Sequence, residues 1–297
     1  MRQLQNELPP DGRRPARAAL DRAAIARIEE RARFVRLETV RLISIAKVGH
    51  YTSVFSCAEI FASLYYDVMN LRPGTPAWAE RDRFLMGKGH AAVGLYPILA
   101  NLGFFPAEWL DSYTRLGSPL GDHPDMRKVP GIDFSSGSIG HALSGGLGMV
   151  LGQRVAGRDF NVFVLLGDGE MHEGQVWEAA LSAAHHKANR LIAIVDRNGY
   201  QLDGKVDDII GIEPLDEKWR AFGWEVHTVD GHDVGALTLK LRELADDASR
   251  TGPACLIAQT SKGKGVGYME TEPGWHLGYL ADDDAARAID EINGAVL

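Results

Sequence analysis

The second half of the chain alternates short apolar segments with helical ones. The apolar segments are FNVFVLL, RLIAIVD, EVHTV and ACLIAQT, at 160–166, 190–196, 225–229 and 254–260. Helices are expected between them at 177–187 and 234–247. Apolar strands that alternate with helices are typical of a parallel sheet buried on both faces. We therefore predict an α/β fold, a parallel sheet with helices on both faces.

The first half of the chain is mainly helical. Apolar residues recur every three or four positions from Ala19 to about Lys47, the spacing of an amphipathic helix. Other predicted elements are helices at 57–66, 91–102, 106–113 and 141–157 and a short buried strand at 83–86. The helix at 141–157 is rich in small residues, so we expect it to pack closely against a neighbour. A long loop rich in glycine, proline and serine spans 117–139, and such loops are usually functional.

Composition restricts the function classes. The chain has 32 Lys and Arg against 40 Asp and Glu, a net charge of −8, so nucleic acid is not expected as the main partner. Cys57 and Cys255 form neither a disulfide framework nor a metal cluster, which fits a reducing cytoplasm. We expect no membrane span, because that needs a run of about 18 apolar residues, and no secretory signal.

The first residues differ from the rest of the chain. They hold three closely spaced prolines and several arginines. We predict a mobile N-terminal arm over 1–18 and a single domain over 19–297.

Polar residues gather where the predicted strands end. Gly167-Asp168-Gly169 follows directly after the strand at 160–166, and a helix is predicted soon afterwards. Amides at a helix N-terminus favour phosphate, and glycines let a ligand approach the backbone. A carboxylate beside a phosphate needs a bridging cation, and Mg²⁺ or Ca²⁺ takes such oxygen ligands. The pattern therefore predicts a metal–diphosphate site, the alternative being a tight turn with a solvated Asp168.

The end of the next strand strengthens the metal interpretation. Asn198 follows the strand at 190–196, and one helix and one strand separate it from Asp168. The carboxyl ends of neighbouring parallel strands meet at one edge of the sheet, where ligands bind. Asp168, the Asn198 amide oxygen and the Tyr200 carbonyl would thus supply three oxygen ligands, and phosphate oxygens and a water would complete the coordination.

These motifs resemble a known family. A Gly-Asp-Gly followed by an asparagine at the next strand end resembles the thiamine-diphosphate-binding motif, and 167–204 resembles the transketolase family in its split, N-terminal-subunit form. The other matching segments are 48–53, 81–90, 122–149 and 260–276. The resemblance implies the thiamine-diphosphate-binding fold, with thiamine diphosphate and Mg²⁺ or Ca²⁺ as cofactors.

The resemblance also implies a role for each matching residue. The metal would be held by Asp168, Asn198 and the Tyr200 carbonyl. The cofactor-binding residues would be His90, Gly169 and His276 at the diphosphate, the turn Gly137, Ser138 and Ile139 at the aminopyrimidine, Asn198, and Glu173 at the contact with a partner domain. His50, His90, His123 and His276 would line the substrate channel, with His50, His123 and His276 as catalytic residues. A lone histidine is usually structural, but four in loops near strand ends suit a substrate with many hydroxyls, because neutral imidazole both donates and accepts.

Several positions depart from the family pattern. They are Tyr51 in place of proline, Gly87 in place of serine or asparagine, Asp122 in place of glycine, His141 in place of glutamine, and Leu277-Gly278-Tyr279 after His276. All are expected near the channel. They favour an unusual ketose donor or acceptor over ordinary sugar phosphates.

The resemblance further implies that the site is incomplete. In the family, the glutamate that protonates the aminopyrimidine lies in a second domain, which we do not find here. We therefore expect a partner chain, a C-terminal transketolase subunit with the pyrimidine-binding domain, self-association, and a two-plus-two heterotetramer. The assembled enzyme would transfer a two-carbon ketol unit from a ketose or ketose phosphate to an aldose or aldose phosphate. The alternatives are the alpha subunit of a 2-oxo-acid dehydrogenase, a 1-deoxyxylulose-5-phosphate synthase-like protein, and a non-catalytic cofactor-binding half.

Overall fold

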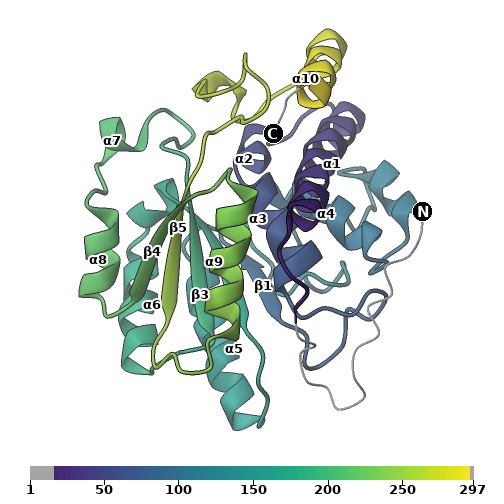
Figure 1. Cartoon of the computed structure of the whole chain (residues 1–297). Coiled ribbons are helices and arrows are strands. Elements are labelled where there is room, and N and C mark those ends of the chain that lie inside the picture. Colours follow the sequence, from purple (N-terminus) through teal and green to yellow (C-terminus); the bar gives the residue numbers. More distant parts are fainter. Residues whose placement is uncertain (1–16, 295–297) are drawn as a thin grey trace.

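A computed structural model describes residues 17–294, and its core is a five-stranded parallel sheet (Figure 1). In sheet order the strands are β1 (Arg83–Met86), β2 (Val162–Gly167), β3 (Leu191–Arg197), β5 (Ala254–Gln259) and β4 (Glu225–Asp230). Every neighbouring pair is parallel. The predicted α/β fold is confirmed. The predicted arm lies outside the described residues except for its last two, and the division at residue 18 stays a prediction.

Helices cover both faces of the sheet. One layer contains α1 (Arg22–Ala46), α2 (Thr52–Phe55), α3 (Ala58–Ser63), α4 (Ala92–Asn101), α9 (Val234–Asp246) and α10 (Asp282–Gly294). The other contains α5 (Ala142–Val155), α6 (Gly174–His185), the short α7 (Val206–Ile209) and α8 (Leu215–Ala221). Side chains along a strand alternate between the layers, so Phe163 joins the first core and Val164 the second.

Short helical turns complete the structure. A π-helical turn, Leu64–Val68, continues α3, and 3₁₀ turns form Gly89–Ala91, Ala107–Ser112, Gly169–His172 and Pro273–Trp275. The predicted helix at 57–66 is therefore partly π-helical, and the predicted helix at 106–113 is a 3₁₀ turn. The helices α2, α7, α8 and α10 were not predicted.

Local sequence explains how the long helices begin and pack. Asp21 caps α1 by accepting from the Ala24 amide at 2.8 Å, and Asp233 caps α9 by accepting from the Ala236 amide at 2.9 Å. In α5, a Cβ on Gly146 would lie 2.7 Å from Val164. The small residues of this helix therefore let it approach the sheet, as predicted.

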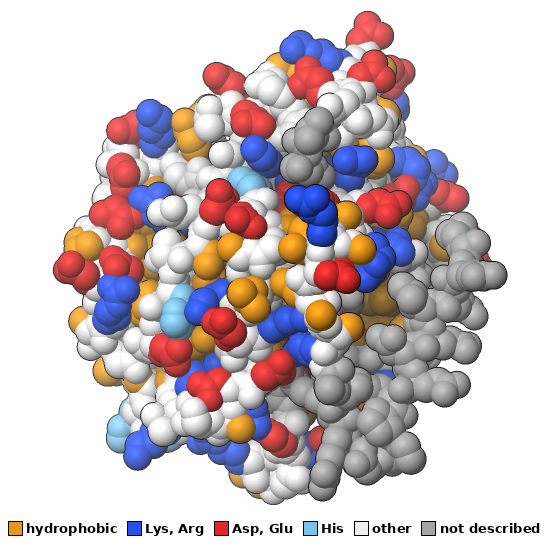
Figure 2. Space-filling model, viewed as in Figure 1, with side chains coloured by type: hydrophobic (Ala, Val, Ile, Leu, Met, Phe, Trp, Pro, Cys, Tyr) orange, Lys and Arg blue, Asp and Glu red, His pale blue; other side chains and the backbone are white. Residues whose placement is uncertain are grey.

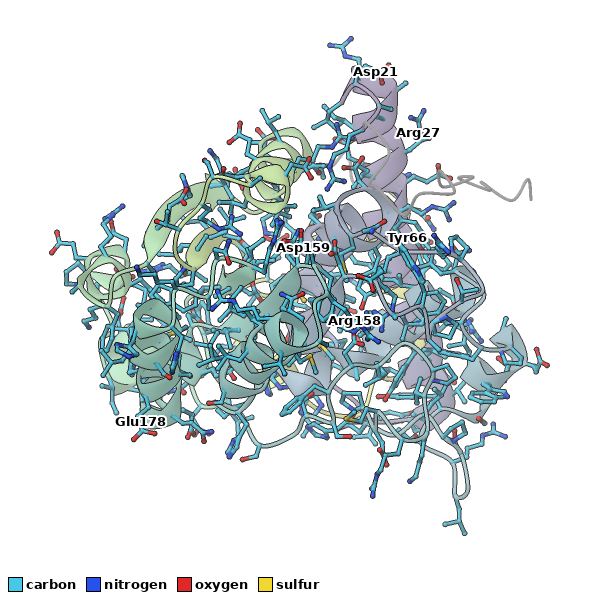
Figure 3. The ribbon with its side chains drawn as sticks, turned by 90° about the horizontal axis from the view of Figure 1, so that it is seen from below. Asp21, Arg27, Tyr66, Arg158, Asp159 and Glu178 are labelled. Carbon is cyan, nitrogen blue, oxygen red and sulfur yellow. The ribbon has the colours of Figure 1, made fainter. Side chains whose placement is uncertain are left out.

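The strand register sets the position of the site. Gly167 of β2 is paired with Asp196 of β3, so Asp168 and Asn198 follow at the same edge. We call this the carboxyl edge, and the opposite one the amino edge. Figure 3, seen from below the view of Figure 1, labels Arg158 and Asp159, which precede β2 at the amino edge.

The surface carries mixed charges. Figure 2 shows acidic and basic side chains interspersed over the face in view. Cys57 and Cys255 are both buried and free. None of the helices in the described part of the chain combines the length and apolar character that a membrane span needs. The cytoplasmic location stays a prediction.

Candidate active site

Asp168 is buried at the end of β2. It is 2% exposed. Its Oδ1 accepts from the Gly169 amide at 2.8 Å, and its Oδ2 accepts from the Gly199 amide at 2.6 Å. Burial, and then the nearby carboxylate of Asp196, raise the pKa of Asp168 to about 6. The alternative of a solvated aspartate in a turn is therefore wrong.

Asn198 is buried at the end of the neighbouring strand and is held from both sides. Its amide oxygen accepts from the Tyr200 amide at 3.0 Å, and its Nδ2 donates to Asp196 at 3.3 Å. An amide oxygen has two lone pairs, so one remains for another partner. The structure thus brings the Asp168 and Asn198 loops together through the Gly199 amide, and Tyr200 follows in the same turn.

These oxygens fit a hard divalent cation. Asp168 is a buried carboxylate, and burying a charge is costly unless it is paired. Mg²⁺ and Ca²⁺ prefer the carboxylate, amide and carbonyl oxygens that Asp168, Asn198 and Tyr200 supply. No group of three or more His, Cys, Asp or Glu side chains within residues 17–294 is arranged to hold a metal. The predicted set contains only one such side chain, so that absence does not bear on it.

A buried ion pair that the sequence analysis missed lies beneath this site. Lys88, 3% exposed, pairs with the fully buried Asp196. Burial alone would raise the pKa of Asp196, but Lys88 and the hydroxyls of Thr260 and Ser56 hold it below its ordinary value. The Ser56 hydroxyl donates to Asp196 at 2.7 Å. The sequence analysis identified the Lys-Gly-His segment as a motif. No sequence signal, however, indicates that its Lys88 pairs with Asp196 of β3.

A second buried lysine was also missed. Lys262, in the loop after β5, donates to the Gln201 carbonyl at 3.1 Å. Burial, and then Lys88, lower the pKa of Lys262 to about 8. Lys88 is paired with Asp196, whereas the ammonium group of Lys262 is bonded to a backbone carbonyl, so Lys262 is the lysine that could meet an anion. Gly169 lies beside them, and a Cβ there would come within 2.8 Å of Gln201.

The predicted cofactor turn is packed against the Lys-Gly-His segment. A Cβ on Gly89 would lie 2.9 Å from the Gly137 amide nitrogen, and one on Gly137 would lie 3.6 Å from the His123 ring. Gly137 and Ser138 are exposed, and Ile139 is half-buried. Gly89 therefore has no room for a side chain, whereas a Cβ on Gly137 would make an ordinary van der Waals contact. The turn therefore faces outward beside two of the predicted histidines.

Glu170 fixes the far end of that turn. Its Oε1 accepts from the Gly140 amide at 2.7 Å and its Oε2 from the Gly167 amide at 3.1 Å. Burial raises the pKa of Glu170 to about 7. A Cβ on Gly87 would lie 2.3 Å from this carboxylate. The glycine that replaces the family's serine or asparagine at position 87 therefore leaves space for the Glu170 side chain.

The four predicted histidines form one cluster. The ring centre of His50 lies 5.0 Å from that of His90, 5.3 Å from that of His276 and 6.1 Å from that of His123. His90 and His276 are 5.4 Å apart. Burial and then Lys88 lower the pKa of His90 well below its usual range, and burial and then Lys262 lower the pKa of His276 to about 3. Both rings are therefore neutral at physiological pH.

Backbone contacts hold the cluster in place. The amides of Gly49 and Gly278 each donate to the carbonyl of the other, at 3.2 and 3.3 Å. The Thr52 hydroxyl donates to the Trp275 carbonyl at 3.0 Å. These bonds join the segment that carries His50 to the one that carries His276.

Three buried polar atoms around the cluster make no hydrogen bond within the described residues. They are His50 Nδ1, Ser136 Oγ and His276 Nδ1. Buried polar atoms without partners are rare, so Ser136 Oγ and His276 Nδ1 indicate a place for a polar ligand, whereas His50 Nδ1 faces the Asp122 carboxylate at 3.4 Å. The residues therefore fit a bound cofactor and substrate.

The departures from the family pattern lie in different places. Asp122 lies inside the histidine cluster. Tyr51, which directly follows His50, is 1% exposed, and its ring packs near that of Trp275, which precedes His276, with ring centres 6.1 Å apart. His141 is exposed and its ring lies 3.2 Å from the Ile139 carbonyl. Leu277 and Tyr279 are exposed beside His276.

Glu173 lies at the exposed start of α6. A Cβ on Gly140, whose φ is +88°, would lie 2.8 Å from the Glu173 Cβ. Glu173 therefore borders the cofactor turn but is not part of the histidine cluster.

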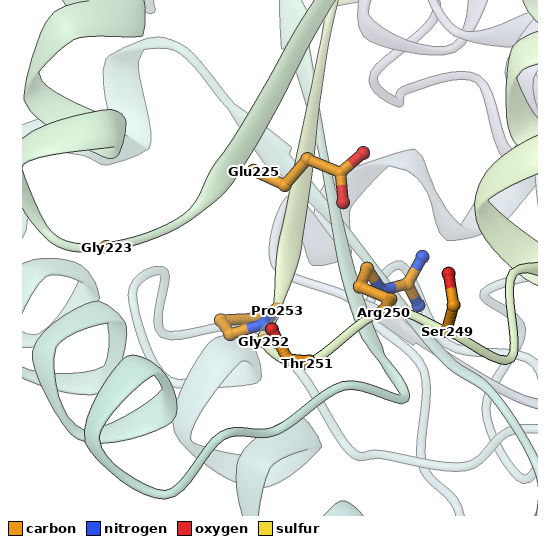
Figure 4. A pocket seen from close by; sticks show the side chains of 7 residues that line it. All are labelled: Gly223, Glu225, Ser249, Arg250, Thr251, Gly252 and Pro253. Atoms are coloured by element: carbon orange, nitrogen blue, oxygen red, sulfur yellow. The ribbon is translucent and has the colours of Figure 1, made fainter.

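A separate hollow of ≈ 250 Å³ lies at the amino edge, lined by Gly223, Glu225 and 249–253 (Figure 4). Its guanidinium group, Arg250, already donates to the carbonyls of Asn189 and Leu244. The hollow contains none of the predicted site residues, and we assign it no function.

Comparison with known proteins decides the family. The model of the "Transketolase, thiamine diphosphate binding domain" family matches residues 28–293. The chain belongs to the transketolase family.

Relatives within the transketolase family differ in length. The chain is 36% identical to an apulose-4-phosphate transketolase subunit of Phocaeicola vulgatus over 87% of this chain and 91% of that protein. It is 36% identical to the 6-deoxy-6-sulfo-D-fructose transketolase subunit SqwG of Clostridium sp., over 89% and 96% of the two chains. The transketolase structure from Campylobacter jejuni superposes with a TM-score of 0.83 at 27% identity, covering 90% of this chain and 42% of that one. The chain thus matches the thiamine diphosphate-binding part of transketolases, and it spans nearly all of two relatives named as subunits.

Proposed function

We propose that this chain is the diphosphate-binding subunit of a two-chain transketolase. It transfers a two-carbon ketol unit from a ketose or ketose phosphate to an aldose or aldose phosphate. Thiamine diphosphate and a divalent metal, Mg²⁺ or Ca²⁺, are its cofactors. The observation that carries the proposal is the cluster of His50, His90, His123 and His276 at the edge that also carries Asp168 and Asn198.

Each predicted residue has a role in this proposal. Asp168, Asn198 and the Tyr200 carbonyl hold the metal, and His90, Gly169 and His276 contact the diphosphate. Gly137, Ser138 and Ile139 face the aminopyrimidine. Thiamine diphosphate, when bound, supplies a carbanion that attacks the donor carbonyl.

The histidines act on the sugar. The imidazoles of His50, His123 and His276 donate to or accept from hydroxyl groups and move protons at the donor and acceptor oxygens. A cluster of four imidazoles suits a polyol better than a 2-oxo acid, which has few hydroxyls. This favours a transketolase over the alpha subunit of a 2-oxo-acid dehydrogenase.

We propose an unusual ketose as the donor or product. Two of the relatives are named for apulose 4-phosphate and for 6-deoxy-6-sulfo-D-fructose. Asp122 within the cluster, and Leu277 and Tyr279 beside it, supply side chains that the family pattern lacks.

We propose a partner subunit that carries the pyrimidine-binding domain. The relatives named as subunits support it, and so does the exposure of Gly137, Ser138 and Glu173 at the cofactor turn. The partner would cover the surface around 137–148, in a two-plus-two heterotetramer of self-associating halves.

The test is turnover with and without the partner. The purified chain, supplied with thiamine diphosphate and Mg²⁺, is expected to show no ketol transfer. Adding the pyrimidine-domain chain is expected to restore turnover and to tighten cofactor binding together, because both need the closed site. Robust ketol transfer by this chain alone would contradict the two-chain proposal.

A further inference from the structure

The carboxylate of Asp122 lies between two of the clustered histidines. Its Oδ2 is 3.4 Å from Nδ1 of His50 and 3.4 Å from Nδ1 of His123. The two rings are nearly perpendicular, at 70°. One carboxylate oxygen can accept from two donors, so a single side chain faces both imidazoles.

The other carboxylate oxygen is anchored to the core. Asp122 Oδ1 accepts from the Tyr113 hydroxyl at 3.2 Å, and Tyr113 is fully buried. The adjacent Gly121 carbonyl accepts from the Tyr96 hydroxyl at 2.8 Å. Two buried tyrosines thus fix the loop and aim the free carboxylate oxygen at the histidines.

The charge of Asp122 is maintained at neutral pH. Burial acts to raise its pKa, but contacts with His50, His123 and Tyr113 keep that pKa below its ordinary value. His50 Nδ1 is buried without a hydrogen bond in the described part of the chain, and Asp122 is the carboxylate that faces it. The rings of His90 and His276 also lie next to that of His50. Hydrogen bonds at such sites are often long without ligand and shorten in the complex.

Resting on the proposed function, we propose that Asp122 is a positioning residue that accepts the Nδ1–H groups of His50 and His123. In a neutral imidazole one nitrogen donates and the other accepts, so this fixes Nε2 of both rings as an acceptor for sugar hydroxyls. Glycine, the usual residue of the family at this position, has no carboxylate to do this. Asp122 is therefore a feature of this chain, whereas the four histidines are common to the family.

The direct test is the tautomer of each ring. Long-range ¹H–¹⁵N imidazole spectra of the labelled chain at neutral pH, assigned with His50→Gln and His123→Gln, report which nitrogen carries the proton. We expect the Nδ1–H form for both rings in the wild type and its loss in Asp122→Gly. Asp122→Asn keeps an acceptor oxygen for the Tyr113 hydroxyl, and we expect its Nδ1–H population to lie between those of the wild type and Asp122→Gly. This variant replaces Asp122→Gly in the test if the glycine variant does not fold. Asp111→Asn is the control, because Asp111 is exposed and pairs with Arg41 at 2.7 Å.

A kinetic test uses the enzyme assembled with its partner subunit. In metal enzymes, groups that orient a functional histidine contribute roughly 10- to 100-fold in activity, and we expect a loss of kcat in that range for Asp122→Gly with cofactor affinity unchanged. The proposal is overturned if either ring is Nε2–H or doubly protonated in the wild type, or if the tautomers do not change in Asp122→Gly. The spectra do not depend on turnover, so they test the role of Asp122 even if the chain proves not to be a transketolase subunit.

Discussion

Two ion pairs at opposite edges of the sheet differ in how far they are buried. At the amino edge, Asp159 pairs with Arg190 at 2.6 Å and is 68% exposed. At the carboxyl edge, Lys88 and Asp196 form a pair in which both side chains are buried. Asp168 is buried beside them without a basic side chain bonded to its carboxylate in the described contacts.

This difference in burial sets how much each pair contributes to stability. Exposed pairs keep their hydration, and each contributes only about 0–1 kcal/mol. Buried charges and unpartnered polar atoms are costly, and natural proteins tolerate such violations mainly at functional sites. The amino edge also has a buried pair, Arg81 with Asp133. The carboxyl edge differs in holding Asp168, a buried carboxylate whose described hydrogen bonds come from backbone amides.

The largest contrast is expected in turnover. His123→Ala should lower turnover of the assembled enzyme by about 10²–10⁴-fold, the usual contribution of one acid–base group. Cofactor affinity should change much less. His185→Ala is the matched control, because His185 is exposed at the last residue of α6. Steady-state kinetics measures both, and wild-type turnover by His123→Ala would remove that histidine from the catalytic set.

The next contrast is in stability. Asp196→Ala leaves Lys88 buried without its carboxylate, and breaking a buried pair from one side costs about 3–5 kcal/mol. Asp159→Ala breaks an exposed pair and should lower the free energy of unfolding by at most about 1 kcal/mol. Urea unfolding of the two variants tests this. Equal losses of stability in both variants would show that the two pairs do not differ in the way described.

The last contrast is a pH dependence. The pKa of His276 falls to about 3 on folding, so this group adds stability above its unfolded pKa near 6.5 and loses it as pH falls toward 3. Each histidine accounts for at most about 1.4 kcal/mol per pH unit. His276→Gln should therefore flatten the acid side of the unfolding curve relative to wild type, whereas His185→Gln should not. Parallel curves for wild type and His276→Gln would contradict the burial of a neutral ring.

The sequence predicted the fold because its strands are apolar and end in polar glycine turns. The segments at 160–166, 190–196 and 254–260 need no tertiary information to be identified as buried strands. The edge strand β4 is the exception, since it is partly exposed along its length. The helices α8 and α10 were missed because α8 is only seven residues long and α10 is mostly polar, with three aspartates in its first turn.

The candidate site was predicted only where a motif marks it. The meeting of the Asp168 and Asn198 loops followed from strand adjacency, and the histidines followed from the family resemblance. The burial of Lys88 against Asp196, and the position of Asp122 between two imidazoles, depend on how α2, β3 and the loop at 117–139 pack. The burial of the Tyr51 ring against Trp275 likewise shows only in the packing.

The most direct test of the account compares the edges in cofactor binding. Thiamine diphosphate is titrated calorimetrically, with and without Mg²⁺, into the assembled wild type, Asp168→Ala and Asp159→Ala. The account predicts Mg²⁺-dependent binding that Asp168→Ala abolishes and Asp159→Ala leaves unchanged. Undiminished affinity in Asp168→Ala would contradict it, because the carboxyl edge would then not hold the metal–diphosphate group.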